Sequence, residues 1–184
     1  MHVPKSFLLG LALSTAFLLA LTVGAAPPVS SQHDKLAAWA GHWRVRIETK
    51  ETQFGHARTD DYDSKCSFLP NGVFLSCDYL SMQPDPESGH VVDDVAIVYY
   101  SDVDNTFKYT NIALEGGPQE NRMTVEGNVW TRPFEIPRKS GGVADARETY
   151  TFVSPDKELG RLEISLDKGA HWIVVNEAVG TRER

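Results

Sequence analysis

The side chains most able to carry chemistry in this sequence are its histidines and its acidic runs. Six histidines occur, and none lies at metal-ligand spacing from another histidine or a cysteine. Acidic runs at 60–63 and 93–94 could supply paired carboxylates. Acid–base catalysis requires two carboxyls in different environments, however, and acidic runs beside turns are usually solvated. We therefore expect neither a metal site nor a catalytic carboxylate pair.

Motifs that can be recognised from spacing are also missing. The sequence has no Gly-x-Ser-x-Gly elbow, phosphate-binding loop or dinucleotide fingerprint. A Ser-His-Asp arrangement leaves no signature in one sequence and stays open. We predict no catalytic residue, no metal and no cofactor. The sequence favours a protein that is not an enzyme.

The two cysteines, Cys66 and Cys77, predict one disulfide. They flank a hairpin sequence, and two registers are open. A turn centred on Asn71-Gly72 places Cys66 opposite Cys77, whereas a three-residue bulge sends the two side chains to opposite faces. Because a disulfide needs Cα atoms roughly 4.4–6.8 Å apart, the first register fits. Pro70 cannot donate the closing hydrogen bond of a two-residue turn, so we expect a four-residue loop and a structural bridge.

The N-terminus has the pattern of a secretory signal peptide. Lys5 precedes an apolar run at 7–23, and small residues at 24–26 suit cleavage after Ala25. The alternative is an uncleaved anchor, but the run is short for a span of roughly 20 residues and no basic flank follows it. We predict the following organisation: a signal peptide at 1–25, a mobile leader at 26–32 and one domain at 33–184.

Length and charge narrow the partners of the exported protein. The full chain has 184 residues and a formal net charge of −7. An acidic surface without a basic patch argues against nucleic acid and anionic membranes. We expect a secreted or periplasmic protein with no membrane span after signal cleavage.

Hydrophobic periodicity predicts one short helix followed by many strands. Leu36, Ala37 and Trp39 follow a helical period that Gly41 ends. From Trp43 onward the period is two, as in half-buried strands. The expected strands are 43–48, 68–79, 95–100, 106–114, 122–130, 148–153, 161–166 and 171–179. This pattern predicts an all-β antiparallel barrel or sandwich of about eight to ten strands with a short N-terminal helix.

The segment 36–43, which ends in Gly41-His42-Trp43, resembles the opening of the calycin group, in which a short helix precedes Gly-x-Trp on the first barrel strand. Within that group the chain resembles the bacterial lipocalin-like domains named domain of unknown function 1579, with counterparts at 100–102 and 181–182. The resemblance implies one lipocalin-like β-barrel whose closed end is plugged by Trp43. Arg182 would then lie across the indole as a cation–π partner.

Two further likenesses bear on function. Haem-binding relatives resembling nitrobindin continue Gly-x-Trp with two alternating glycines, whereas this chain has Arg44-Val45-Arg46, so haem is not expected. The segment 165–172 resembles the Asp-box of sialidase-like propellers, in which the Asp caps a hairpin turn and the Trp packs beneath it. A single copy of that box is a folding element and predicts a hairpin here.

If the barrel forms, its inward positions mix aromatic and polar side chains, as small-ligand cavities do. The candidate ligand-binding residues are Tyr62, Tyr79, Phe107, Tyr109, Glu148 and Tyr150. The same side chains could instead simply fill the barrel. We expect an uncharacterised secreted lipocalin-like protein that binds a small apolar or amphipathic ligand. Two alternatives stay open: an isomerase- or cyclase-like barrel enzyme acting on a lipid-like substrate, and a non-catalytic interaction domain.

Overall fold

The computed structural model describes residues 30–84, 89, 91, 93–113, 117–138 and 141–184. The expected signal peptide and the first part of the expected leader lie outside the described residues. Within them the chain forms a short 3-10 helix, η1 (His33–Ala38), followed by strands only. These strands are β1 (Gly41–Thr49), β2 (Arg58–Phe68), β3 (Phe74–Ser81), β4 (Asp93–Ser101), β5 (Thr106–Ala113), β6 (Gly117–Glu126), β7 (Val129–Pro137), β8 (Val143–Ser154), β9 (Lys157–Ser165) and β10 (Ile173–Glu183).

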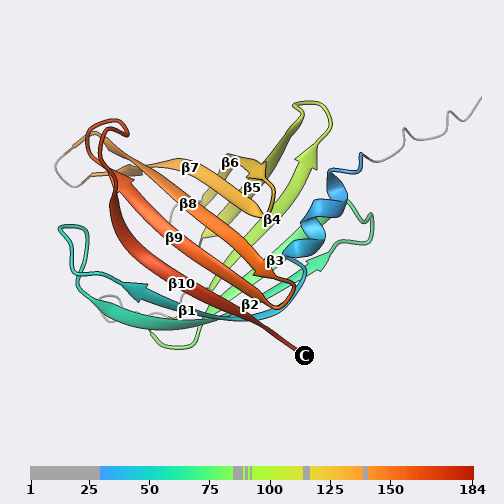
Figure 1. Cartoon of the computed structure of the whole chain (residues 1–184), viewed down its shortest axis with the longest axis horizontal. Coiled ribbons are helices and arrows are strands. Elements are labelled where there is room, and N and C mark those ends of the chain that lie inside the picture. Colours follow the sequence, from blue (N-terminus) through green and yellow to red (C-terminus); the bar gives the residue numbers. More distant parts are fainter. Residues whose placement is uncertain (1–29, 85–88, 90, 92, 114–116, 139–140) are drawn as a thin grey trace, which may run out of the picture.

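The strands close into one antiparallel barrel. Each strand pairs with its neighbours in sequence, and β1 completes the ring by pairing with β10 (Figure 1). The prediction of an all-β antiparallel barrel with a short N-terminal helix is confirmed, and the ten strands reach the upper end of the expected range. The pairing is shortest between β6 and β7, where only 124–126 pair with 129–131.

Three expectations about individual segments were wrong. The run at 68–79 is not one strand, because the loop at 70–73 divides it between β2 and β3. The run at 122–130 is not one strand, because a tight turn at Gly127-Asn128 divides it between β6 and β7 and pairs Glu126 with Val129. Gly127 has a φ of 62°, which a glycine adopts without strain. The acidic run at 60–63 lies within β2 rather than beside a turn. Its outward-facing Asp63 is bound there, 3.1 Å from a nitrogen of Arg44 on β1.

The cysteine hairpin has the predicted register. Cys66 on β2 lies directly opposite Cys77 on β3, and the two form a disulfide. The Leu69 amide donates to the Phe74 carbonyl at 2.8 Å, which leaves a four-residue loop at 70–73. Both cysteines are buried, so the bridge is part of the barrel interior.

Helix η1 lies at one end of the barrel (Figure 1) and contributes to its packed interior. Leu36 within the helix and Trp39 just after it are both buried. They pack in a cluster with residues of β3 to β7, including Phe107 and Trp130. His33 fixes the helix: its imidazole packs on Tyr100 and lies 3.2 Å from an Asp102 carboxylate oxygen. Helix and strands therefore close this end of the barrel together.

The first and last strands meet beside this helix through Trp43 and Arg182. The Arg182 guanidinium lies 4.2 Å from the centroid of the Trp43 ring, and it donates to the carbonyls of Ala38 and Ala40. Gly41, with a φ of +127°, makes room, because a Cβ there would meet Arg182 Nη1 at 2.5 Å. Arg182 thus ties the end of β10 to the chain entering β1.

The segment resembling an Asp-box forms the turn between β9 and β10. Ser165 Oγ accepts from the Gly169 amide at 2.8 Å, and an Asp167 carboxylate oxygen accepts from the His171 amide at 2.8 Å. Hydrogen bonds from His171 and Ser165 lower the pKa of Asp167 to about 2. The Trp172 ring packs against Gly169. The expected hairpin is present, with its turn held by side chains rather than by strand pairing.

The barrel is also packed near the end opposite to η1. A second buried cluster there joins the start of β8 to the ends of β7 and β9, and Phe54 from the β1–β2 connection packs on it. Its members include Phe134, Ala144, Ala146, Leu162, Ile164 and Val175. The interior between the two clusters contains the candidate site.

Candidate functional site

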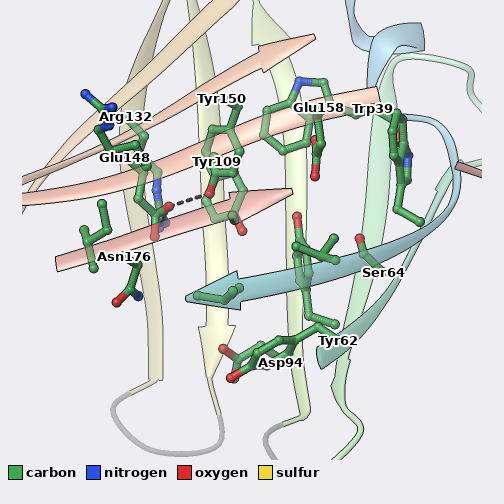
Figure 2. Close-up of a pocket in the computed structure, with 18 of the residues that line it drawn as sticks. Trp39, Tyr62, Ser64, Asp94, Tyr109, Arg132, Glu148, Tyr150, Glu158 and Asn176 are labelled. Atoms are coloured by element: carbon green, nitrogen blue, oxygen red, sulfur yellow. Dashed lines mark hydrogen bonds and ion pairs between the residues drawn. The ribbon is translucent and has the colours of Figure 1, made fainter. Parts of the chain in front are cut away.

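A cavity of about 300 Å³ lies inside the barrel between the two packed clusters (Figure 2). Its aromatic lining consists of Trp39, Trp43, Tyr62, Tyr79, Tyr109 and Tyr150. Its polar side chains include Ser64, Asp94, Asn111, Arg132, Glu148, Glu158 and Asn176. This volume is at the lower limit of pockets that hold small molecules, roughly 300–1,000 Å³.

The hollow exists because two facing inward positions of the β9–β10 wall carry almost no side chain. Gly160 on β9 faces Ala178 on β10, and a Cβ at Gly160 would lie only 3.0 Å from the Cβ of Ala178. Two residues farther along β10, Gly180 pairs with Glu158 on β9. The facing strands carry tyrosines instead, so small residues on one wall leave space that the rings on the other do not fill.

A buried ion pair forms one side of the cavity. Arg132 on β7 lies 2.5 Å from a Glu148 carboxylate oxygen on β8, and the Tyr150 hydroxyl donates to the same oxygen. The Arg132 guanidinium also stacks on the rings of Tyr109 and Phe134. Burial opposes the charged form of Arg132, but Glu148, Tyr150 and Tyr109 hold its pKa above the ordinary value. Arg132 and Glu148 thus neutralise each other inside the barrel.

The tyrosines of the cavity are hydrogen-bond donors rather than bases. Burial raises the pKa of Tyr109 to about 12 and raises the pKa values of Tyr79 and Tyr150 well above the ordinary value. Their phenols therefore stay protonated across the physiological range.

Glu158 is the exception among the polar side chains. It lies on the Trp39 side of the cavity, away from Arg132 and Glu148 (Figure 2). Burial raises the pKa of its carboxyl to about 7, against the lowering effect of Arg182. Arg182 directs its hydrogen bonds to carbonyl oxygens instead. Among the described residues, nothing forms a hydrogen bond or ion pair with the Glu158 carboxyl.

The structure brings most of the predicted site residues together. Tyr62, Tyr79, Tyr109, Glu148 and Tyr150 all line the cavity. Phe107 is inside the barrel but does not line the cavity, because its ring packs on Trp130 at 4.8 Å and on Tyr100 at 4.9 Å.

Sequence reasoning missed Arg132, Glu158 and Asn176, together with the small residues that create the space. The signal was present on β9, where a period of two places Glu158, Gly160 and Leu162 on one face. The strand pairing confirms that this face looks into the cavity.

Within the described part of the chain, no group of three or more histidine, cysteine or acidic side chains is arranged to hold a metal ion. The same residues include no helix long and apolar enough to cross a membrane.

The fold and its interior define a calycin-like β-barrel. The crystal structure of Rv2717c from M. tuberculosis is similar, with a TM-score of 0.57, 13% identity and coverage of 85% of this chain and 100% of that one. The S-type phycobiliprotein lyase CPES from Guillardia theta is similar with a TM-score of 0.57, 14% identity and coverage of 84% and 94%. At these identities the likeness shows the fold alone.

No protein-family model and no curated protein matches the sequence. The narrower resemblance to domain of unknown function 1579 is therefore unsupported, while the calycin-like barrel stands. The Cys66–Cys77 disulfide is typical of an oxidising compartment outside the cytoplasm.

Proposed function

We propose that this barrel binds one small amphipathic molecule non-covalently in the cavity between β9–β10 and the tyrosine-bearing strands. The observation that supports this most is the hollow itself: Gly160 and Ala178 leave open a space whose other walls are aromatic and polar. A barrel that served only as a scaffold would gain stability by filling this space, because cavities cost packing energy.

The polar groups favour binding over the alternative of a barrel enzyme. Glu148, a ligand-binding candidate in the sequence, is held by Arg132 and Tyr150. The raised pKa values of Tyr79, Tyr109 and Tyr150 keep these phenols protonated. Paired charges and fixed donors are suited to orienting a bound ligand.

The neutral fluorophore N-phenyl-1-naphthylamine tests the proposal, because its emission rises on entering an apolar cavity. We expect saturable binding to the disulfide-bonded protein and displacement by octan-1-ol. Ala178→Leu fills the hollow and should abolish both signals. Val179→Leu is the matched control, since the side chain of Val179 is exposed. Equal binding by wild type and a folded Ala178→Leu variant would place the probe elsewhere and contradict the proposal.

We propose further that residues 1–25 direct export of this protein. The disulfide supports this, because such bonds form and persist outside the cytoplasm. Expression with a C-terminal tag, followed by mass measurement of the exported chain, should give a mature protein that starts at Ala26. Recovery of an uncleaved chain in the membrane fraction would favour the anchor instead.

A further inference from the structure

We propose that the ligand carries a protonated amine, or another organic cation, and that this group sits against Glu158. The inference rests on the proposed function and names the chemical class of the ligand. It is argued from the charges of the cavity, from its walls and from the polar atoms that have no partner.

The cations near the cavity are already engaged. Arg132 is paired with Glu148 and stacked between two rings. Arg161 contributes to the lining, but its guanidinium lies 3.1 Å from the exposed Glu177 carboxylate. A ligand carboxylate would therefore find no unpaired cation among the described residues that line the cavity, and it would have to share the space with Glu158.

The Glu158 carboxyl, by contrast, is available. Its side chain lies across Gly180 and reaches the cavity beside Trp39. Among the described residues this half-buried carboxyl has neither a hydrogen bond nor an ion pair. A ligand cation would supply the missing partner.

The walls around Glu158 also suit a cation. Trp39, Trp43 and Tyr79 line the cavity on this side, and aromatic faces attract ammonium groups electrostatically. Farther along β10, Asn176 Oδ1 is buried without a partner and offers a second acceptor to a hydroxyl or amine of the ligand. Trp39 Nε1 and Arg132 Nε are buried donors without a partner, and they suit an uncharged acceptor such as a hydroxyl oxygen of the ligand.

The charged and titratable groups that face Glu158 are few. Arg182 on β10 and Tyr79 on β3 interact with it electrostatically. The neighbour on β8 is Phe152, and Trp39 after η1 is likewise not titratable in this range. Changes in cation affinity between pH 5.5 and 8.5 would therefore report Glu158.

The test compares three probes with the same alkyl chain: octylamine, octan-1-ol and octanoate, measured by titration calorimetry at pH 8. A primary amine resembles lysine and stays protonated there. We expect octylamine to bind at least about tenfold more tightly than octan-1-ol, and octanoate most weakly. Glu158→Gln should bring octylamine to within about twofold of octan-1-ol, both measured on the same variant. Glu126→Gln, an exposed glutamate with the same loss of charge, is the control.

A second measurement needs no variant at Glu158. In the wild type the affinity for octylamine should rise between pH 5.5 and 8.5, while that for octan-1-ol stays constant. Equal affinities for octylamine and octan-1-ol, tightest binding by octanoate, or an octylamine preference that survives Glu158→Gln would each overturn the amine inference and leave the proposed function standing. Failure of all three probes and of N-phenyl-1-naphthylamine to bind would overturn both.

Discussion

The side chain of Glu158 lies directly over the Cα of Gly180 on the neighbouring strand. A Cβ built at position 180 would lie 2.5 Å from Glu158 Oε1 and 2.8 Å from Glu158 Cδ, well inside van der Waals contact. No positive φ requires a glycine at 180, so the reason for glycine there is the space that the carboxyl group occupies. Gly180 thus determines where the unpartnered carboxyl of the cavity lies.

Gly180→Ala should therefore displace Glu158. We expect the free energy of unfolding to fall by up to about 1 kcal/mol, because the atoms in the way belong to a flexible side chain that can rotate. In a Glu158→Ala background the collision is absent, so the same substitution should cost much less, and the difference measures the contact. Urea denaturation of the four proteins provides the values. Equal costs in both backgrounds would show that the contact is unimportant.

Glu158 should also make stability depend on pH. Its pKa is about 7 in the folded protein and 4.5 as the ordinary value, so the folded state binds the proton more tightly. Stability is then highest below pH 4.5, falls as pH rises towards 7 and levels off above it. The total loss is at most about 3 kcal/mol.

Glu158→Gln tests this dependence, because glutamine cannot titrate. The variant should be more stable than wild type at pH 8, and the difference between the two should shrink as pH falls through the interval. Thermal unfolding across pH 4.5 to 8 gives the comparison. A constant difference between the two proteins would mean that Glu158 titrates normally. Asp167, whose pKa is lowered to about 2, acts below this window and affects both proteins alike.

The barrel could be predicted from the sequence because a period of two survives in nearly every strand. Cys66 and Cys77 fixed one register independently, since only directly opposed cysteines can form the bridge. The turn at Gly127-Asn128 was missed because a two-residue turn preserves the alternation across it. Periodicity thus predicts faces well and turn positions less well.

The site was harder to predict, chiefly because of a bulge in β10. The pairing of β10 with β9 shifts between Val174 and Asn176, so that Asn176 and Ala178 face the cavity while Val179 is exposed. Strict alternation from Val175 would have placed Val179 inside instead. Whether the barrel is hollow depends on these inward positions, and no local pattern shows the bulge.

The Arg132–Glu148 pair provides a third prediction. Arg132→Met leaves Glu148 without its counter-ion inside the barrel and should cost about 3 kcal/mol, at the low end for buried pairs because Glu148 is partly exposed. Arg132→Met combined with Glu148→Gln should recover most of this loss. The outer-face pair Arg161–Glu177 is the control, and Arg161→Met should cost less than about 1 kcal/mol. Equal costs for the two arginines would show that the inner pair is solvated.

Ser165 should hold the β9–β10 turn more firmly than its size suggests. It is 1% exposed, and its hydroxyl donates to an Asp167 carboxylate oxygen while accepting from the Gly169 amide. Ser165→Ala leaves that amide without its partner, so we expect a loss of about 1–3 kcal/mol in unfolding free energy. Ser154→Ala offers a matched comparison, because the hydroxyl of the exposed Ser154 accepts only one long hydrogen bond, from the Asp156 amide at 3.3 Å. We expect this substitution to change the free energy of unfolding by no more than about 0.5 kcal/mol. Amide hydrogen exchange separates the two effects: Gly169 should lose protection in Ser165→Ala only. If Gly169 stays protected in that variant, the turn is held by Asp167 and Trp172 instead.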